Sequence, residues 1–336
     1  MAQFNDIYMR DYPGDTGQIP SDLRQNICYS PDIIPYGANP NPNYQTDFVN
    51  NYNGPFNYYQ NINPSGYNYI YVRGFNAFQG PQTGSIYLYY AKASLLLWPT
   101  VWAGNQIQNT NNTLAATIPT TPTNSVCVGQ GAFYWQPPSI SPQDHFCLVA
   151  RVVTQQDPNV FPTTIADFAQ WVANNANIAW RNVALVTQPS PNYSTFVTMA
   201  NPVMQTNTFT LTVTCTGIPD GTVVSLVGSE PSPAVNSSFT VGPPNQTGSN
   251  PKVNQFGFTV FDIPPQFSEA IQLSANLGTI FPVGSSIRFE YYWLTQSSHP
   301  LAALGIEPAE YGIQDSEPGV ADQGIMLPMG DFTFQF

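Results

Sequence analysis

Apolar and polar residues alternate along much of the chain, and this period of two predicts β-strands. In residues 145–152 one face is wholly apolar from Phe146 to Val152, whereas the other face is mixed. Comparable runs lie at 67–75, 84–95, 178–186, 207–215, 221–228, 236–242, 252–263, 269–277, 285–295 and 331–336. Because short strands separated by turn residues are typical of antiparallel sandwiches, we expect an all-β fold.

A single helical pattern interrupts the strands of the first half. Thr164 and Asp167 have the spacing of a capping box, with Asp in place of the usual Glu. Phe168 and Val172 then recur on one helical face. We therefore predict one short helix near 164–174, which caps an open end of a sheet.

The distribution of turn residues divides the chain into two domains. Residues 1–66 are dense in Pro, Gly, Asn and Asp but also aromatic. We therefore expect an ordered, irregular N-terminal arm that packs on the first domain. A first β-sandwich is expected at 67–187, a linker at 188–205 and a second β-sandwich at 206–336. The predicted architecture is thus two tandem antiparallel domains.

The composition indicates a polar surface with few charges. Charged residues make up 8% of the 336 residues, against about 25% in typical soluble domains, and the formal net charge is -12. Since nucleic-acid binding rests on neutralising phosphates, the lack of a basic patch argues against a nucleic-acid partner. No segment approaches ~18 consecutive apolar residues, so we expect no membrane span.

The cysteines and acids of the sequence do not indicate a metal site. The four cysteines are Cys28, Cys127, Cys147 and Cys215. They form no CxxC or Cys/His cluster, so a structural zinc is not expected, while disulfides and free thiols both stay open. Asp11, Asp15 and Asp32 could bind calcium, but they lack the alternating spacing of a dedicated calcium loop. We therefore predict no cofactor, with calcium as an open but unsupported alternative.

The sequence offers little catalytic chemistry. A Ser-His-Asp triad would need His145 or His299, and neither lies in a nucleophile motif. Glu307 and Glu310 are close in sequence, but nothing places them on the two sides of a glycosidic bond. We therefore predict a protein that is not an enzyme and has no catalytic residues.

The aromatic residues leave two explanations open. Tryptophans and tyrosines form platforms on which sugars stack, and they also fill cores, which is the favoured explanation. The tryptophans are Trp98, Trp102, Trp135, Trp171, Trp180 and Trp293.

Five segments of the first half carry a family resemblance. In order they are SPDI (30–33), YIYVRGFN (69–76), IYLYYAKAS (86–94), HFCLVARV (145–152) and NNANIAWRNVALV (174–186). Over about residues 10–187 this order resembles an immunoglobulin-like β-sandwich module of large exported bacterial surface proteins, peptidase-associated proteins and phage-like assemblies. The resemblance implies Ig-like or jelly-roll-like domains and a role in scaffolding and attachment, with no catalytic residues to carry over.

Three arginines lie inside predicted strands, namely Arg73, Arg151 and Arg181. An uncompensated buried charge is costly, so each of them needs partners. For Arg181 we predict a buried side chain that forms a structural ion pair with Asp32.

One segment, residues 301–330, breaks the strand rhythm as a long acidic loop. It combines acids with apolar side chains that a loop has no reason to carry unless something covers them. The residues expected to bind a partner are Leu304, Ile306, Glu307, Glu310, Tyr311, Ile313, Asp315 and Glu317. Two structures could cover these apolar side chains. One is the edge of the protein's own sheet, in which case the segment is an ordered flap, and the other is a neighbouring subunit or receptor.

Together these features predict a non-enzymatic structural or adhesive component of an exported bacterial or phage-like assembly. It would act through protein partners or self-assembly. The alternatives are a secreted carbohydrate-binding or toxin-like module that binds a glycan through an aromatic surface, and a hydrolase. The uncharged, polar composition favours an extracellular location or a place in an extracellular assembly. The N-terminus has no apolar signal-peptide core, so we expect no cleavable signal peptide in this chain.

Overall fold

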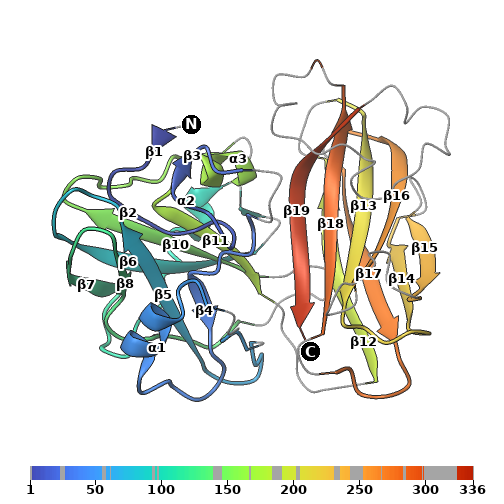
Figure 1. Cartoon of the computed structure of the whole chain (residues 1–336). Coiled ribbons are helices and arrows are strands. Elements are labelled where there is room, and N and C mark those ends of the chain that lie inside the picture. The colour runs from blue at the N-terminus through green and yellow to red at the C-terminus, as the bar shows by residue number, and fades with distance from the viewer. Residues whose placement is uncertain are drawn as a thin grey trace. The chain divides into compact units, whose positions relative to one another are not determined.

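The alternation of side chains is realised as antiparallel strands, so the fold is all-β as predicted (Figure 1). Among the residues that the structure describes, strands hold 48% and three short helices hold 7%. The computed structural model describes residues 2–22, 27–54, 58–60, 62–92, 95–96, 98–138, 146–165, 168–183, 191–201, 205–230, 235–242, 253–265, 267–282, 285–296, 298 and 324–335. These residues form two compact units, one within 1–139 and 146–187 and the other within 188–336.

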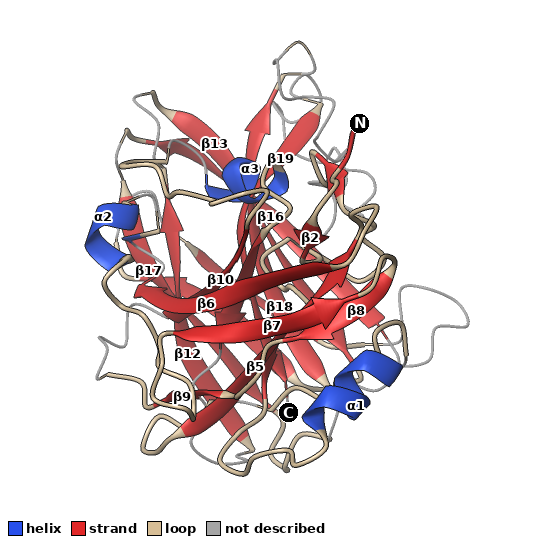
Figure 2. Ribbon diagram, turned by 90° about the vertical axis from the view of Figure 1, so that its left-hand side faces the viewer, coloured by secondary structure: helices blue, strands red, loops and turns tan. Residues whose placement is uncertain are grey.

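One sheet of the first unit has four strands in the order β11-β10-β6-β7. The strands are β6 (Gln82–Lys92), β7 (Ala115–Thr121), β10 (Phe146–Thr154) and β11 (Ile178–Val183). Figure 2 shows β6 and β7 side by side in this sheet. The apolar face predicted for the run at 145–152 is buried at Phe146, Leu148, Ala150 and Val152.

The second sheet of the first unit is built around β5 (Asn68–Asn76). Two short strands flank its first half, β4 (Ile33–Pro35) and β9 (Phe133–Trp135), and two flank its second half, β2 (Ile7–Tyr8) and β8 (Ser125–Val128). Trp135 joins the two sheets, because its ring packs 5.5 Å from those of Tyr90 in β6 and Phe146 in β10. A separate ladder pairs β1 (Ala2–Gln3) with β3 (Gln18–Ile19).

The N-terminal 66 residues are more regular than the sequence predicted. β2 and β4 pair with β5 as part of its sheet, and helix α1 (Tyr44–Asn50) follows them. Strands of two or three residues between turns are too short to show a period of two, so the pattern of Pro, Gly and Asn concealed them.

The helix predicted near 164–174 is present as α3 (Phe168–Ala173), with Phe168 and Val172 buried. Asp167 of the predicted capping box lies outside the described residues. The structure adds α1 and α2 (Pro99–Trp102) to the single helix that was expected. Helix α2 begins with Pro at its first turn and is too short for an apolar stripe to reveal it.

The second unit contains two four-stranded sheets, β12-β17-β14-β15 and β16-β13-β18-β19. The strands are β12 (Asn192–Ala200), β13 (Asn207–Thr216), β14 (Val223–Gly228), β15 (Asn236–Thr240), β16 (Val253–Ile263), β17 (Ser268–Asn276), β18 (Ser286–Thr295) and β19 (Ile325–Gln335). Aromatic rings meet between the sheets, Tyr193 with Phe334 at 4.8 Å and Phe239 with Phe256 at 3.7 Å. The unit is therefore a sandwich of two sheets.

Two boundaries of the second half differ from the expectation. β12 occupies much of the segment 188–205, which was expected to be a linker. Its serines, threonines and nearby prolines gave it the composition of a connection. β19 begins at Ile325, inside the segment 301–330 that was expected to be a loop.

The four cysteines are buried thiols, and none of these described residues forms a disulfide. Among the helices of the described residues, none is long and apolar enough to cross a membrane.

Candidate ligand-binding site

A pocket of about 620 Å³ lies against strand β5 in the first unit. Tyr69 and Tyr71 of β5 form its floor. The remaining lining residues come from α1 with its preceding turn, from the loop before β7 and from the loop between β8 and β9: Pro40, Asn41, Tyr44, Gln45, Thr110, Asn111, Gln130, Gly131 and Ala132. Every described residue that lines the pocket is uncharged, in a chain whose formal net charge is -12.

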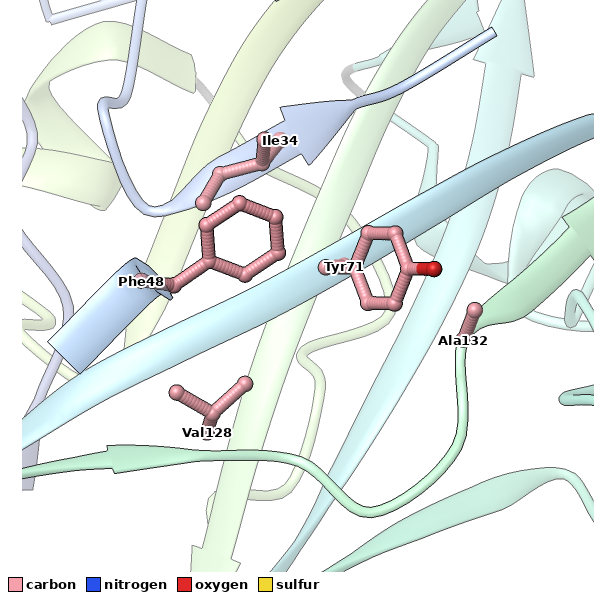
Figure 3. Close-up of a cluster of buried hydrophobic side chains, with 5 residues drawn as sticks. All are labelled: Ile34, Phe48, Tyr71, Val128 and Ala132. Carbon is pink, nitrogen blue, oxygen red and sulfur yellow. The ribbon is translucent and has the colours of Figure 1, made fainter. Parts of the chain in front are cut away.

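The inner end of the pocket is fixed by Tyr71, which is 1% exposed. Figure 3 shows its ring between Phe48 and Ala132, with the hydroxyl on the side away from Phe48. This hydroxyl accepts a hydrogen bond from the backbone N–H of Asn41 at 2.8 Å. Burial raises the pKa of Tyr71, so the hydroxyl stays protonated at neutral pH and keeps both a donor and an acceptor.

The wall that α1 provides is held by Tyr44. Its ring stacks on Tyr71 with 4.9 Å between centroids, and its hydroxyl accepts a hydrogen bond from the backbone N–H of Gly131 at 2.9 Å. One side chain thus connects the helix, the floor and the turn before β9. Because such contacts hold the walls in place, the pocket is formed before any ligand arrives, and this lowers the entropic cost of binding.

The opposite wall is a loop organised by Asn109, which is 3% exposed. Its Oδ1 accepts hydrogen bonds from the N–H groups of Asn111 and Thr113 at 2.9 and 3.1 Å, and its Nδ2 donates to the carbonyl of Ala115 at 2.9 Å. Gly131 has a φ of +87°, and a Cβ there would meet Nδ2 of Asn111 at 3.0 Å. The positive φ at this position therefore favours glycine.

Three exposed polar side chains at the rim form no hydrogen bond with another described residue: Thr110, Asn111 and Gln130. They supply a hydroxyl and two amides, which both donate and accept hydrogen bonds. The site therefore combines an aromatic floor with neutral hydrogen-bonding groups at its edge.

The predicted ion pair between Arg181 and Asp32 does not form. Asp32 is fully buried and pairs with Arg10 at 2.6 Å and with Arg73 at 2.9 Å. Burial by itself raises the pKa of Asp32, but the charges and hydrogen bonds of the two arginines lower it below the ordinary value. The predicted pairing is therefore wrong. The register of β4 on β5 places Asp32 beside Arg73, and Arg10 of the N-terminal segment reaches Asp32 with its backbone N–H as well as its side chain.

Arg181 is buried, as predicted, but by aromatic rings. Its guanidinium lies 3.7 Å from the ring centroid of Tyr29 and 3.5 Å from that of Tyr59, and it donates a hydrogen bond to the carbonyl of Ser30 at 2.8 Å. Cation–π contact and one carbonyl thus replace the expected carboxylate.

Other residues considered from the sequence contribute little to the site. The predicted partner-binding residues, Leu304, Ile306, Glu307, Glu310, Tyr311, Ile313, Asp315 and Glu317, lie outside the described residues, as do His145 and His299. Within the described part of the chain, no group of three or more His, Cys, Asp or Glu side chains is placed to hold a metal ion. Trp102, Trp135 and Trp180 are buried in the core, so tyrosines and not tryptophans line the pocket.

Sequence reasoning missed the tyrosine floor, although a signal was present. Tyr67, Tyr69 and Tyr71 alternate in the segment YNYIY, and alternate residues of a strand share one face. The fold and the pocket together define an all-β protein with an uncharged, tyrosine-floored pocket on one sheet.

Comparison with known proteins does not assign the chain to a family. No family model matches the chain, and no curated protein matches it. Among solved structures the chain is similar to a transglutaminase of red sea bream, with 10% sequence identity and a TM-score of 0.19. The match covers 70% of this chain but only 28% of the transglutaminase, and likeness at this TM-score carries no argument about function.

Proposed function

We propose that the protein is a non-enzymatic adhesive β-sandwich protein whose first unit binds a neutral glycan in the pocket on β5. The observation that carries the proposal is the pairing of a tyrosine floor with exposed amides and a hydroxyl at the rim. A sugar ring presents apolar C–H groups that pack on aromatic faces. Its hydroxyls, at the ring edge, need both donors and acceptors, and amide and hydroxyl side chains provide both.

The absence of charge among the described lining residues favours a neutral ligand. An anionic sugar would be desolvated there without a cation, and a cationic ligand would meet no carboxylate. The long-range field of a chain with net charge -12 also disfavours anions. Neutral polysaccharide fits both conditions.

The same lining supports binding without turnover. Glycoside hydrolysis ordinarily uses two carboxylates on either side of the scissile bond. The described lining residues include tyrosine, amide and hydroxyl side chains but no carboxylate, histidine or cysteine. The pocket therefore holds a sugar without supplying an acid or a base to cleave it.

The setting we infer is an extracellular surface or assembly. The resemblance of residues 10–187 to attachment modules of exported proteins and the low content of charged residues support it. In this setting the first unit binds glycan, and the segment 301–330 remains the proposed contact for a protein partner or a second copy.

A glycan array followed by isothermal titration tests the proposal on the full chain. We expect binding to neutral glycans, with loss of about 1 kcal/mol per hydrogen bond in Asn111→Ala and Gln130→Ala. Gln156→Ala is the matched control, because Gln156 is also exposed but lies outside the pocket. Binding that is unaffected by both rim substitutions, or a preference for charged glycans, contradicts the assignment.

A further inference from the structure

We infer that the glycan site continues out of the pocket along a column of exposed tyrosines, and that it takes a neutral oligosaccharide chain and not a single terminal sugar. The inference rests on the proposed function of the pocket. The column consists of Tyr69, Tyr134 and Tyr67, in that order from the pocket outward.

The rings of the column are in contact with one another. Tyr69 lines the pocket, and its ring lies 5.0 Å from that of Tyr134, its partner in the register of β5 and β9. Tyr134 then stacks face to face on Tyr67, with 4.2 Å between centroids and an interplanar angle of 3°. The aromatic surface is therefore continuous from the pocket floor to the Tyr67 ring.

The column leads from the core to solvent. Tyr71 at the inner end of the floor is 1% exposed, whereas Tyr134 is 38% and Tyr67 is 49% exposed. Tyr69 packs against the buried cluster that contains Phe48 and Tyr71, so core packing accounts for its place. Core packing does not account for the stacked rings of Tyr134 and Tyr67, because both are half-exposed and their outer surfaces remain in water.

The backbone beneath the outer rings is held rigidly. Asn68 is fully buried; its Oδ1 accepts from the N–H of Asn63 at 2.7 Å, and its Nδ2 donates to the carbonyls of Asn63 and Gly66 at 2.9 and 3.0 Å. These bonds fix the turn that carries Tyr67. The backbone N–H of Tyr134 donates to the carbonyl of Gln108 at 2.8 Å. Because both rings are already ordered, stacking a ligand on them costs little entropy.

The pocket and the column together set the size of the ligand. From Tyr71, at the inner end of the pocket, to Tyr67, at the outer end of the column, the chain advances by about 13 Å, at roughly 3.3 Å per residue. This span exceeds one sugar ring, so a ligand that occupies both the pocket and the Tyr67 ring must be a chain. One sugar of the chain lies in the pocket and a neighbouring sugar stacks on the outer pair.

The test is isothermal titration of the full chain with neutral gluco-, manno- and xylo-oligosaccharides of increasing length, from the monosaccharide upward. For the series that binds, we expect wild-type affinity to rise with chain length and then to level off. Tyr67→Ala should weaken binding of the longer chains about five- to tenfold, as the stacking of one ring implies, and leave the monosaccharide unaffected. Tyr67→Phe should retain the affinity, because the ring and not the hydroxyl makes the contact.

Trp98→Ala is the matched control, since Trp98 is 44% exposed and lies outside the pocket and the column. Wild-type affinity that does not depend on chain length overturns the inference and leaves the pocket assignment standing. A loss in Tyr67→Ala that is equal at every length, or no loss at any length, also overturns it. If the wild-type protein binds no member of any series, the proposed function fails and the inference fails with it.

Discussion

Replacing Asp32 by Asn tests whether buried charges hold the first unit together. Oδ1 of Asp32 accepts hydrogen bonds from Nη2 of Arg10 at 2.6 Å and from Nε of Arg73 at 2.9 Å. Oδ2 accepts from the backbone N–H and Nε of Arg10 at 2.8 and 3.1 Å. The substitution removes the charge that both guanidinium groups share, and it leaves them buried.

The expected cost follows from the remaining contacts. Removing one partner of a buried ion pair costs about 3–5 kcal/mol. Two pairs meet at Asp32, which favours the upper end of this range. Each arginine keeps a carbonyl partner, Tyr52 for Arg10 at 2.8 Å and Phe48 for Arg73 at 2.7 Å, and this moderates the loss. We therefore expect Asp32→Asn to lower the free energy of unfolding of the first unit by about 4 kcal/mol.

Urea unfolding followed by tryptophan fluorescence measures this loss, because five of the six tryptophans lie in the first unit. Lys92→Gln is the control, since it removes a charge at an exposed position of the same unit and should change stability by less than about 0.5 kcal/mol. The pKa of Asp32 is lowered in the folded protein, so its contribution is present above the unfolded value and is lost as the pH falls through the folded one. The difference between wild type and variant should accordingly shrink below about pH 4. A loss under about 1 kcal/mol at neutral pH would refute the reasoning.

Two further predictions concern buried groups of the same unit. Arg181→Ala should cost about 3 kcal/mol in the same assay, because it removes the guanidinium between Tyr29 and Tyr59 and its hydrogen bond to Ser30, and an unchanged melting temperature contradicts this. For Asp11, burial and the nearby carboxylate of Asp15 raise the pKa in the folded protein above the pKa in the unfolded chain. The contribution of the protonated Asp11 carboxyl to stability is therefore fully present below the unfolded pKa, about 4, and is lost as the pH rises through the folded pKa. Melting temperatures of Asp11→Asn should therefore improve relative to wild type as the pH rises above about 4, and a constant difference across that range excludes a raised pKa.

The strands could be predicted where they are long and their faces differ. The runs at 67–75 and 207–215 correspond to β5 and β13, because one face of each strand is buried along most of its length and the other only in part, which gives the sequence a period of two. β2 and β4 escaped prediction because two or three residues cannot display a period. β12 escaped it because small polar residues give little contrast between its two faces.

Partners that are distant in sequence could not be derived in the same way. Burial of Arg181 and of Asp32 follows from their apolar surroundings, but pairing them required knowledge of which strands are neighbours. β4 lies on β5, so Asp32 meets Arg73, whereas Arg181 on β11 meets the carbonyl of Ser30 and the ring of Tyr29. The column of tyrosines depends in the same way on the register of β9 against β5, which places Tyr134 opposite Tyr69.

The buried charges and the pocket are connected through helix α1. Nη1 of Arg73 donates to the carbonyl of Phe48 at 2.7 Å, in the last turn of the helix, while Tyr44 in the first turn stacks on the pocket floor. A seven-residue helix is too short to be stable alone, so these tertiary contacts hold it in place. Asp32 fixes Arg73, Arg73 fixes the end of α1, and α1 carries the wall of the pocket. Desolvating three charges in a small domain is costly, and one result of this costly arrangement is the fixed geometry of the pocket wall.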